Sequence, residues 1–212
     1  VHLRMKEGAL EGSARLEQSD GHAEAGIQGE MRWGAAVLPE VDFSKPMELQ
    51  LQARNFRANA AAPFVQSVLS DLDGRIDADA RFHVAPGGKD GRMSGSVTLR
   101  EGVVVVPQIG ERFHAIRGRV IMKPWGTLLF EDISAEAPTG KLTATGEAVL
   151  QGLGLQSASA KIKIARGQSI PITLEGVPMG RAYGDVTARA RMTADGKRLD
   201  IAVDVPLLHV DL

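Results

Sequence analysis

The stretch GSVTLREGVVVVPQIGERFHAIRGRVIMK, residues 95–123, decides the fold. Polar and apolar side chains alternate along most of it, and this period of two is typical of a β-strand with one wet face and one apolar face. Four consecutive valines, Val103 to Val106, interrupt the alternation and put apolar groups on both faces. The stretch therefore predicts strands with an apolar face, and it raises the question of what the second face of the valine run contacts.

The same alternation recurs through the rest of the chain. Residues 47–54 and residues 76–84 each alternate charged or amide side chains with apolar ones. Residues 186–192 and 199–205 do so on either side of Ala194–Lys197, which contains the Asp-Gly pair favoured in tight hairpin turns. The pattern predicts an all-β protein built from antiparallel strands.

Glycine recurs at what we interpret as the openings of strands. The patterns are GEMRW, GRIDA, GSVTL, GRVIM, GEAVL and GDVTA, which begin at residues 29, 74, 95, 118, 146 and 184. Their unequal spacing excludes a solenoid of fixed repeat. Because glycine permits the turns and bulges that bend a sheet, we expect an elongated, curved antiparallel sheet.

One segment departs from the period of two. In NAAAPFVQSVLSDLDG, residues 59–74, the apolar residues have helical spacing, with a proline near the start and a glycine at the end. We predict a short helix over residues 63–72 that packs against the sheet. No linker divides the chain, so we expect a single domain over residues 1–212. Both ends resemble interrupted strands, so we expect a fragment of a longer chain.

Composition and motifs argue against several functional classes. Lys and Arg total 25 against 26 Asp and Glu, and no basic patch stands out, so nucleic acid is not an expected partner. Cysteine is absent and the five histidines lack metal-ligand spacing, so we expect no metal site and no cofactor. Asp77 and Asp79 alternate with apolar residues, as on a solvated outer face. We expect no catalytic residues and no enzyme activity.

The predicted apolar face is poor in rings. Aromatic residues make up 4% of the chain, and Ala, Val, Ile, Leu and Met supply the rest of the face. Closed β cores normally use large rings to fill the interior. The composition therefore permits an interior that another molecule fills. Trp33 and Trp125 are possible stacking platforms, but we interpret them as core or rim residues.

Residues 72–206 resemble the TamB family in the order of their motifs. LDGRIDADARF is followed by SGSVTLREGVVVVPQIGERFHAIRGRVIM and then by GTLLFEDISAEAPTGKLTATGEAVL. This order is similar to that family's glycine-opened strand, its valine- or leucine-rich strand ending in proline, and two further glycine-containing strands. Residues 1–60 match the family only in general texture.

The resemblance implies a half-pipe or β-taco, polar outside and apolar inside, in the periplasm of a Gram-negative envelope. TamB proteins are related to AsmA-like and bridge-like lipid transfer proteins, so it implies a conduit segment that shelters phospholipid acyl chains between the inner and outer membranes. It further implies an outer-membrane barrel partner in the translocation and assembly module, neighbouring modules of the same chain, and a parent anchored in the inner membrane.

We predict that one set of inward side chains lines the groove and solvates acyl chains. In this assignment Val103 and Val105 point inward, while Val104 and Val106 point outward. Three explanations of the outward valines stay open: cover by the predicted helix, a rim that meets a neighbouring module, or strand propensity alone. The predicted lining is Ile76, Val97, Leu99, Val103, Val105, Val120, Met122, Leu142, Ile162, Ile164, Val186, Ile201 and Val203.

Two other functions are compatible with the same pattern. The sheet could be a periplasmic scaffold or chaperone that adds strands to nascent outer-membrane barrels, in which case its edges matter more than its lining. It could also be a closed barrel that stores one small ligand, as lipocalins do. An open sheet and a closed barrel differ in shape, which separates the last alternative from the other two.

Overall fold

The structure is a computed structural model, and it describes residues 2–6, 8–33, 39–42, 44–61, 70–87, 91–106, 111–151, 154–174, 177–193 and 198–211. Within these ranges, three short 3-10 helices connect strands: η1 (Ala58–Ala61), η3 (Pro124–Gly126) and η4 (Arg166–Gln168). The strands are β1 (His2–Lys6), β2 (Ala9–Glu17), β3 (His22–Trp33), β4 (Pro39–Val41), β5 (Met47–Arg57), β6 (Ser70–Val84), β7 (Gly91–Val106), β8 (Glu111–Lys123), β9 (Thr127–Ala137), β10 (Gly140–Gln151), β11 (Gly154–Ile164), β12 (Ile170–Leu174), β13 (Val177–Met192) and β14 (Leu199–Asp211).

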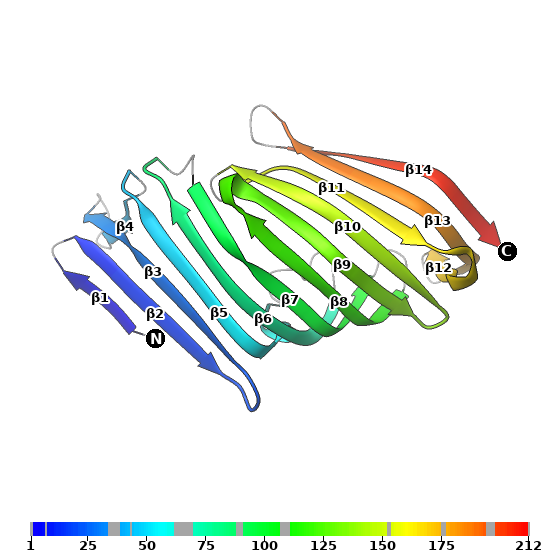
Figure 1. Cartoon of the computed structure of the whole chain (residues 1–212), viewed down its shortest axis with the longest axis horizontal. Coiled ribbons are helices and arrows are strands. Elements are labelled where there is room, and N and C mark those ends of the chain that lie inside the picture. Colours follow the sequence, from blue (N-terminus) through cyan, green and yellow to red (C-terminus); the bar gives the residue numbers. More distant parts are fainter. Residues whose placement is uncertain are drawn as a thin grey trace.

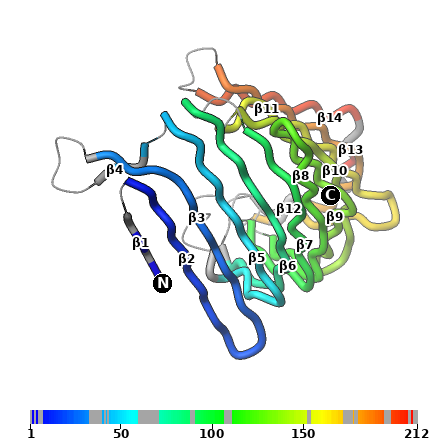
Figure 2. Tube along the Cα trace, turned by 60° about the vertical axis from the view of Figure 1, so that its left-hand side comes forward, coloured from blue at the N-terminus to red at the C-terminus, as the bar shows by residue number. Residues whose placement is uncertain are grey.

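These strands form one open, curved sheet, as predicted. Its order is β1-β2-β3-β5-β6-β7-β8-β9-β10-β11-β13-β12, with β14 paired to β13 and β4 paired to β3. Every pair of neighbours is antiparallel. The two termini lie at opposite ends of the sheet (Figure 1), and the bend is visible in Figure 2. The described strands therefore make an open sheet, and the closed-barrel alternative is wrong for them.

The hairpin predicted near the C-terminus is present. Met192 pairs with Leu199, Ala190 with Ile201 and Ala188 with Val203, so the two apolar phases meet as expected. The predicted turn at Ala194–Lys197 lies outside the described residues, and the backbone N–H of Thr193 donates to the Arg198 carbonyl beside it at 2.8 Å.

The helix predicted over residues 63–72 is not present at its C-terminal end. Residues 70–72 belong to β6, where Ser70 pairs with Val105 of β7. Residues 62–69 lie outside the described part of the chain. A strand partner thus overrides the helical spacing at these positions. Within the described ranges no helix is long and apolar enough to cross a membrane.

The recurrent glycines lie inside strands, which corrects their interpretation as strand openings. Gly118 is in β8 and Gly146 is in β10, and both strands begin several residues earlier. A Cβ atom on Gly118 would lie 2.9 Å from the Ile133 side chain, and one on Gly146 would lie 2.5 Å from the Ser159 carbonyl oxygen. These glycines therefore permit close approach between neighbouring strands where the sheet bends.

A line of β-bulges crosses the sheet from β5 to β9. Four non-glycine residues on β5, β7, β8 and β9 have positive φ: Asn55 (49°), Glu101 (52°), Ala115 (49°) and Asp132 (52°). The strand registers shift at or beside these positions, and β6 shifts twice between Ser70 and Arg75. Because a bulge bends its strand and increases its twist, a row of bulges creases the sheet. We call this row the bulge line.

One polar side chain satisfies the backbone at the β5 bulge. The backbone N–H of Asn55 donates to Asp77 Oδ1 at 3.0 Å. This hydrogen bond lowers the pKa of the Asp77 carboxyl group, and an ion pair with Arg100 acts in the same direction. The polar face of β6 thus supplies the acceptor that the broken ladder between β5 and β6 lacks.

The bulge at Glu101 reverses the predicted phase of the valine run. Gly102 pairs with Ile116 and Val104 with Phe113, and Val104 is only 8% exposed. Val103 pairs with Asp73 instead. The prediction that Val103 and Val105 point inward is therefore wrong, because one extra residue in the bulge moves every later side chain of β7 to the other face. β7 thus changes phase at Glu101, just before the valine run begins.

Beyond the bulge line the apolar face closes on itself. Six buried residues at this side form a cluster, which we call the closed margin: Val104, Phe113, Ala135, Ala137, Ile164 and Ile170. Ile170 comes from β12, whose Cα atoms approach those of β8 to within 8 Å. In a flat sheet the intervening β9, β10, β11 and β13 would hold these strands about 24 Å apart. The sheet therefore curls over at this side.

We expect Gly95→Ala to destabilise the protein. Gly95 has φ of +118°, and an added Cβ would lie 1.9 Å from the Asp79 carbonyl oxygen. The backbone conformation alone should cost about 1–3 kcal/mol. Urea denaturation measures the change, and Gly167→Ala is the matched control because nothing lies within 4 Å of its Cβ position. Equal midpoints for the two variants would contradict the role assigned to Gly95.

Candidate functional site

The apolar side chains form continuous rows across the sheet. Since cross-strand partners project from the same face, the strand registers trace each row from one strand to the next. One row runs through every strand from β2 to β14 except β4 and β12. It consists of Leu16, Ala23, Ala53, Ala78, Val97, Val120, Phe130, Gly146, Ala160, Ala188 and Val203.

A second row of the same kind lies beside the first, two residues along each strand. It consists of Ala14, Ala25, Leu51, Ala80, Gly95, Met122, Leu128, Ala148, Ala158, Ala190 and Ile201. No residue in either row carries a polar side chain. With about 4.8 Å between strands, each row is roughly 50 Å long.

The row between these two projects from the opposite face and is mainly polar. It includes Arg15, Glu24, Gln52, Asp79 and Ser96 in the N-terminal half of the sheet. In the C-terminal half it includes Ile121 and Leu129, so the outer face is not wholly polar. The sheet is thus a single layer with one apolar face and one largely solvated face.

Most of the predicted lining residues lie on the apolar face; Val103 and Val105 do not. The predicted lining residues that do lie on the apolar face differ in exposure. Ile201 and Val203 on β14 are exposed, whereas Ile164 is buried in the closed margin. Those on the face and half-buried are Ile76, Val97, Leu99, Val120, Met122, Leu142, Ile162 and Val186.

The predicted lining omitted several large side chains on the same face. Leu51, Leu128 and Phe130 belong to the two rows, and alternation within their own strands could have identified them. Phe113 is also on this face, in the closed margin. Its position could not be read from strict alternation, because the bulge at Ala115 lies between it and Ile116.

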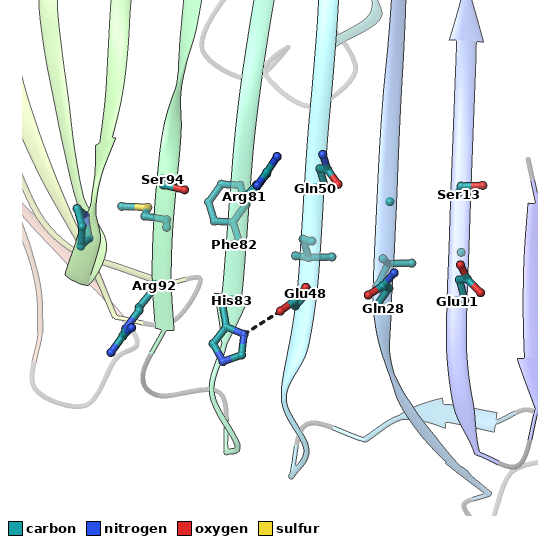
Figure 3. A pocket seen from close by; sticks show the side chains of 16 residues that line it. Glu11, Ser13, Gln28, Glu48, Gln50, Arg81, Phe82, His83, Arg92 and Ser94 are labelled. Carbon is teal, nitrogen blue, oxygen red and sulfur yellow. Dashed lines mark ion pairs between the residues drawn. The ribbon is translucent and has the colours of Figure 1, made fainter.

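A shallow depression of about 620 Å³ lies over β2, β3, β5, β6 and β7. Its middle row is on the apolar face and contains Gly12, Ile27, Leu49, Phe82 and Met93, with Pro124 beside Met93. The rows on either side of it project from the opposite face, and they include Glu48, His83 and Arg92 in one row and Gln50, Arg81 and Ser94 in the other. Figure 3 shows these strands side by side, with His83 directed toward Glu48; the Nδ1–Oε1 distance is 3.4 Å.

The strand ends beside this depression form the border opposite the closed margin. We call this border the free margin, and it comprises Val84, Gly91 and the η3 turn that follows Lys123. The two margins lie at opposite ends of β8, since Phe113 is near its start and Lys123 is at its end. The apolar rows run between the margins and parallel to both.

Glu111 is the one acidic residue buried among the described side chains. It is 7% exposed and pairs with Val106 at the start of β8, two residues from Phe113. Burial raises the pKa of its carboxyl group because the charged form loses hydration. Among the described residues no group of three or more His, Cys, Asp or Glu side chains is placed to hold a metal ion.

Comparison of the chain with family models, with curated proteins and with solved structures finds no match.

Two isoleucines on the apolar face should respond differently to truncation. Ile164→Ala removes a side chain from the closed margin, where it is 8% exposed, and should cost about 2–5 kcal/mol of unfolding free energy. Ile201→Ala changes a side chain that is 66% exposed and should cost little. Urea denaturation checks the difference. Similar losses at the two positions would contradict the division into an open face and a closed margin.

Compared with the wild type, Glu111→Gln should be relatively more stable at neutral pH than at acidic pH. Because its pKa is raised in the folded state, the folded protein binds more protons than the unfolded chain between the unfolded and folded values. In that window, which begins near the ordinary value of 4.5, wild-type stability falls as pH rises. Denaturation from pH 4 to pH 8 should show that Glu111→Gln lacks this fall, and Glu147→Gln on the exposed outer face is the control.

Proposed function

We propose that this chain is a conduit segment that shelters phospholipid acyl chains on its apolar face. The observation that carries the proposal is the pair of uninterrupted apolar rows. In most folds a second layer of strands or helices packs against such an apolar face. Large exposed apolar patches mark interaction sites. Here β14 exposes Leu199, Ile201, Val203 and Val205 on one strand.

The energetics of the proposal favour an acyl chain. Burying one methylene group contributes about 0.8 kcal/mol, so a chain of about fifteen methylenes would gain up to about 12 kcal/mol if fully sheltered. An open face buries only part of each methylene group, so the free energy gained is smaller and the acyl chain can still dissociate. Since neighbouring positions in a row are all small or aliphatic, apart from Phe130, each methylene that moves along a row enters surroundings like those it leaves.

The direction of the rows supports movement along the sheet. Each row crosses the strands, so a chain lying on it passes from one strand to the next without meeting a polar side chain. The resemblance of residues 72–206 to the TamB family agrees with this arrangement, and on that basis we propose a periplasmic location between the inner and outer membranes. Neighbouring modules of a longer chain and an outer-membrane barrel would then continue the path.

One observation favours the scaffold as a second candidate function. β14 is a thirteen-residue strand at the edge of the sheet, and its only pairing partner among the described strands is β13. An edge strand of this length presents backbone groups that can pair with an added strand. In the scaffold the partner would be a nascent barrel polypeptide at this edge, and lipid would not contact the rows.

Ile201→Asp should reduce lipid binding without unfolding the protein. The side chain is exposed on the apolar face, so the carboxylate stays hydrated in the free protein but would lose hydration against an acyl chain. Native mass spectrometry of protein purified gently from cells should show phospholipid on the wild type and less on this variant. Ala202→Asp is the matched control, because residue 202 is exposed and belongs to the outer row.

A photocrosslinker at the same two positions separates the two functions. Lipid adducts at residue 201 and none at residue 202 are expected for the conduit. Polypeptide adducts along β14, with no lipid adduct at residues 97 or 120 of the apolar row, would overturn it in favour of the scaffold.

A further inference from the structure

The two edges of the sheet are β1 and β14, which lie at opposite ends of the molecule (Figure 1). Among the described strands, β1 pairs only with β2 and β14 only with β13. A register shift between Asp204 and Leu207, where Pro206 lies, leaves residues 199–204 as the regular part of β14. Both edges present backbone N–H and C=O groups that an added strand can bond.

The directions of the two edge strands allow them to pair with each other. The strands β1, β2, β3, β5 to β11, β13 and β14 form a continuous series of twelve in which every neighbouring pair is antiparallel. Because twelve is an even number, β14 runs opposite to β1. A second copy placed beside β14, with its apolar face on the same side, therefore offers its β1 as an antiparallel neighbour.

The outer faces of the two edges carry complementary side chains. Asp200, Ala202 and Asp204 alternate with the apolar-row residues of β14, so they project from the outer face, and all three are exposed. On β1, His2 and Arg4 pair with residues on the outer face of β2, and both are exposed. One edge thus presents two carboxylates, and the other presents a guanidinium and an imidazole.

One antiparallel register brings these groups together. With Arg4 of one copy opposite Ala202 of another, the guanidinium lies diagonally between Asp200 and Asp204, within reach of a long side chain. His2 is then directly opposite Asp204. In this register the five residues of β1 pair with residues 200–204, which lie within the regular part of β14.

The contact continues an alternation of charge that the sheet has on both sides of it. Asp200 pairs across the strands with Arg191 of β13, and Arg4 pairs with Glu11 of β2. Joining β14 to β1 therefore gives four neighbouring strands whose outer side chains are basic, acidic, basic and acidic in turn.

Charge favours this contact over pairing between identical edges. Two β14 strands would bring the carboxylates of Asp200 and Asp204 beside those of the other copy, and two β1 strands would bring one Arg4 beside another. Like charges on neighbouring strands destabilise a sheet, whereas opposite charges stabilise it. The apolar face of β14 carries Leu199, Ile201 and Val203, so no inward-pointing charge blocks an added strand.

We propose that copies of this chain associate head to tail, with β14 of one copy paired to β1 of the next. The inference goes beyond the proposed function, since the contact requires no lipid. A five-residue strand pair is smaller than a standard interface of about 1,600 Å², so the association is weak and salt weakens it further. Because the two surfaces differ, assembly leaves one free edge of each kind and continues beyond a dimer.

Two charge-reversal variants test the contact by sedimentation velocity at low salt. Asp200→Arg with Asp204→Arg makes both edges basic, and His2→Glu with Arg4→Glu makes both edges acidic. The wild type should form oligomers larger than a dimer as its concentration rises, and each variant alone should associate about tenfold or more weakly. An equimolar mixture of the two variants should restore association, because every mixed contact joins a basic edge to an acidic one.

Asp79→Arg with Glu147→Arg is the matched control. Both residues are exposed on the outer face, on β6 and β10, so the variant carries the same change of charge as the β14 variant away from either edge. It should associate as the wild type does. Equal loss in this variant would show a general effect of net charge and would overturn the edge contact.

The remaining outcomes separate this inference from the functions proposed above. A wild type that is monomeric at every concentration overturns the head-to-tail contact and leaves acyl-chain binding intact; polypeptide adducts along β14 would then assign the edge to the scaffold. Association that stops at a dimer, or that the mixture of variants does not restore, also overturns it. Oligomers that carry no phospholipid in native mass spectrometry support the contact while counting against the conduit.

Discussion

The structure depends on keeping one face of a single sheet apolar across strands that must also bend. Period-two alternation achieves the first requirement only while each strand stays regular, because every side chain changes face when one residue is added. Bending requires added residues. The bulge line reconciles the two requirements: the extra residues occur at neighbouring positions in successive strands, so the strands change phase together and the apolar face continues beyond the crease.

The consequence of this crease is an uneven distribution of stability. On one side of the bulge line, apolar side chains meet from strands that are distant in sheet order, and β12 completes a buried cluster. On the other side, small residues of the rows such as Ala78 and Ala80 are buried among their neighbours, while Leu51 is 38% exposed. Removing an aliphatic side chain from water contributes about 25 cal/mol per Å². The closed margin realises much of this gain within the chain, whereas exposed residues of the rows such as Ile201 and Val203 realise less of it.

The strands, and the residues of each that face the apolar side, can be predicted from the sequence, because alternation in segments such as 47–54 and 76–84 is strong and local. It does not reveal the crease as directly. Extending the phase of Leu99 by two residues brings Glu101 inward, and extending that of Phe130 brings Asp132 inward. Both are bulge residues. A charged residue at a position where alternation expects an apolar one therefore indicates a bulge. Placing a bulge at Glu101 would have predicted that Val104, and not Val103, lies on the inner face.

Other features of the site lay beyond sequence reasoning for different reasons. Ile164 has the same pattern as Ile162, yet only the structure shows that β12 covers it, since the contact joins strands far apart in the sheet. The predicted helix near residues 63–72 failed at residues 70–72 because a cross-strand partner decides such a segment.

The crease also gives the sheet a mechanical property. From Ala115 to Lys123, β8 extends roughly 26 Å at about 3.3 Å per residue, so a small difference in angle at the bulge becomes a large displacement at the far end. A rotation of about 10° there moves the far end by about 4–5 Å at that strand rise. The bend angle set at the bulge line therefore determines the width of the opening to within about the thickness of a hydrocarbon chain.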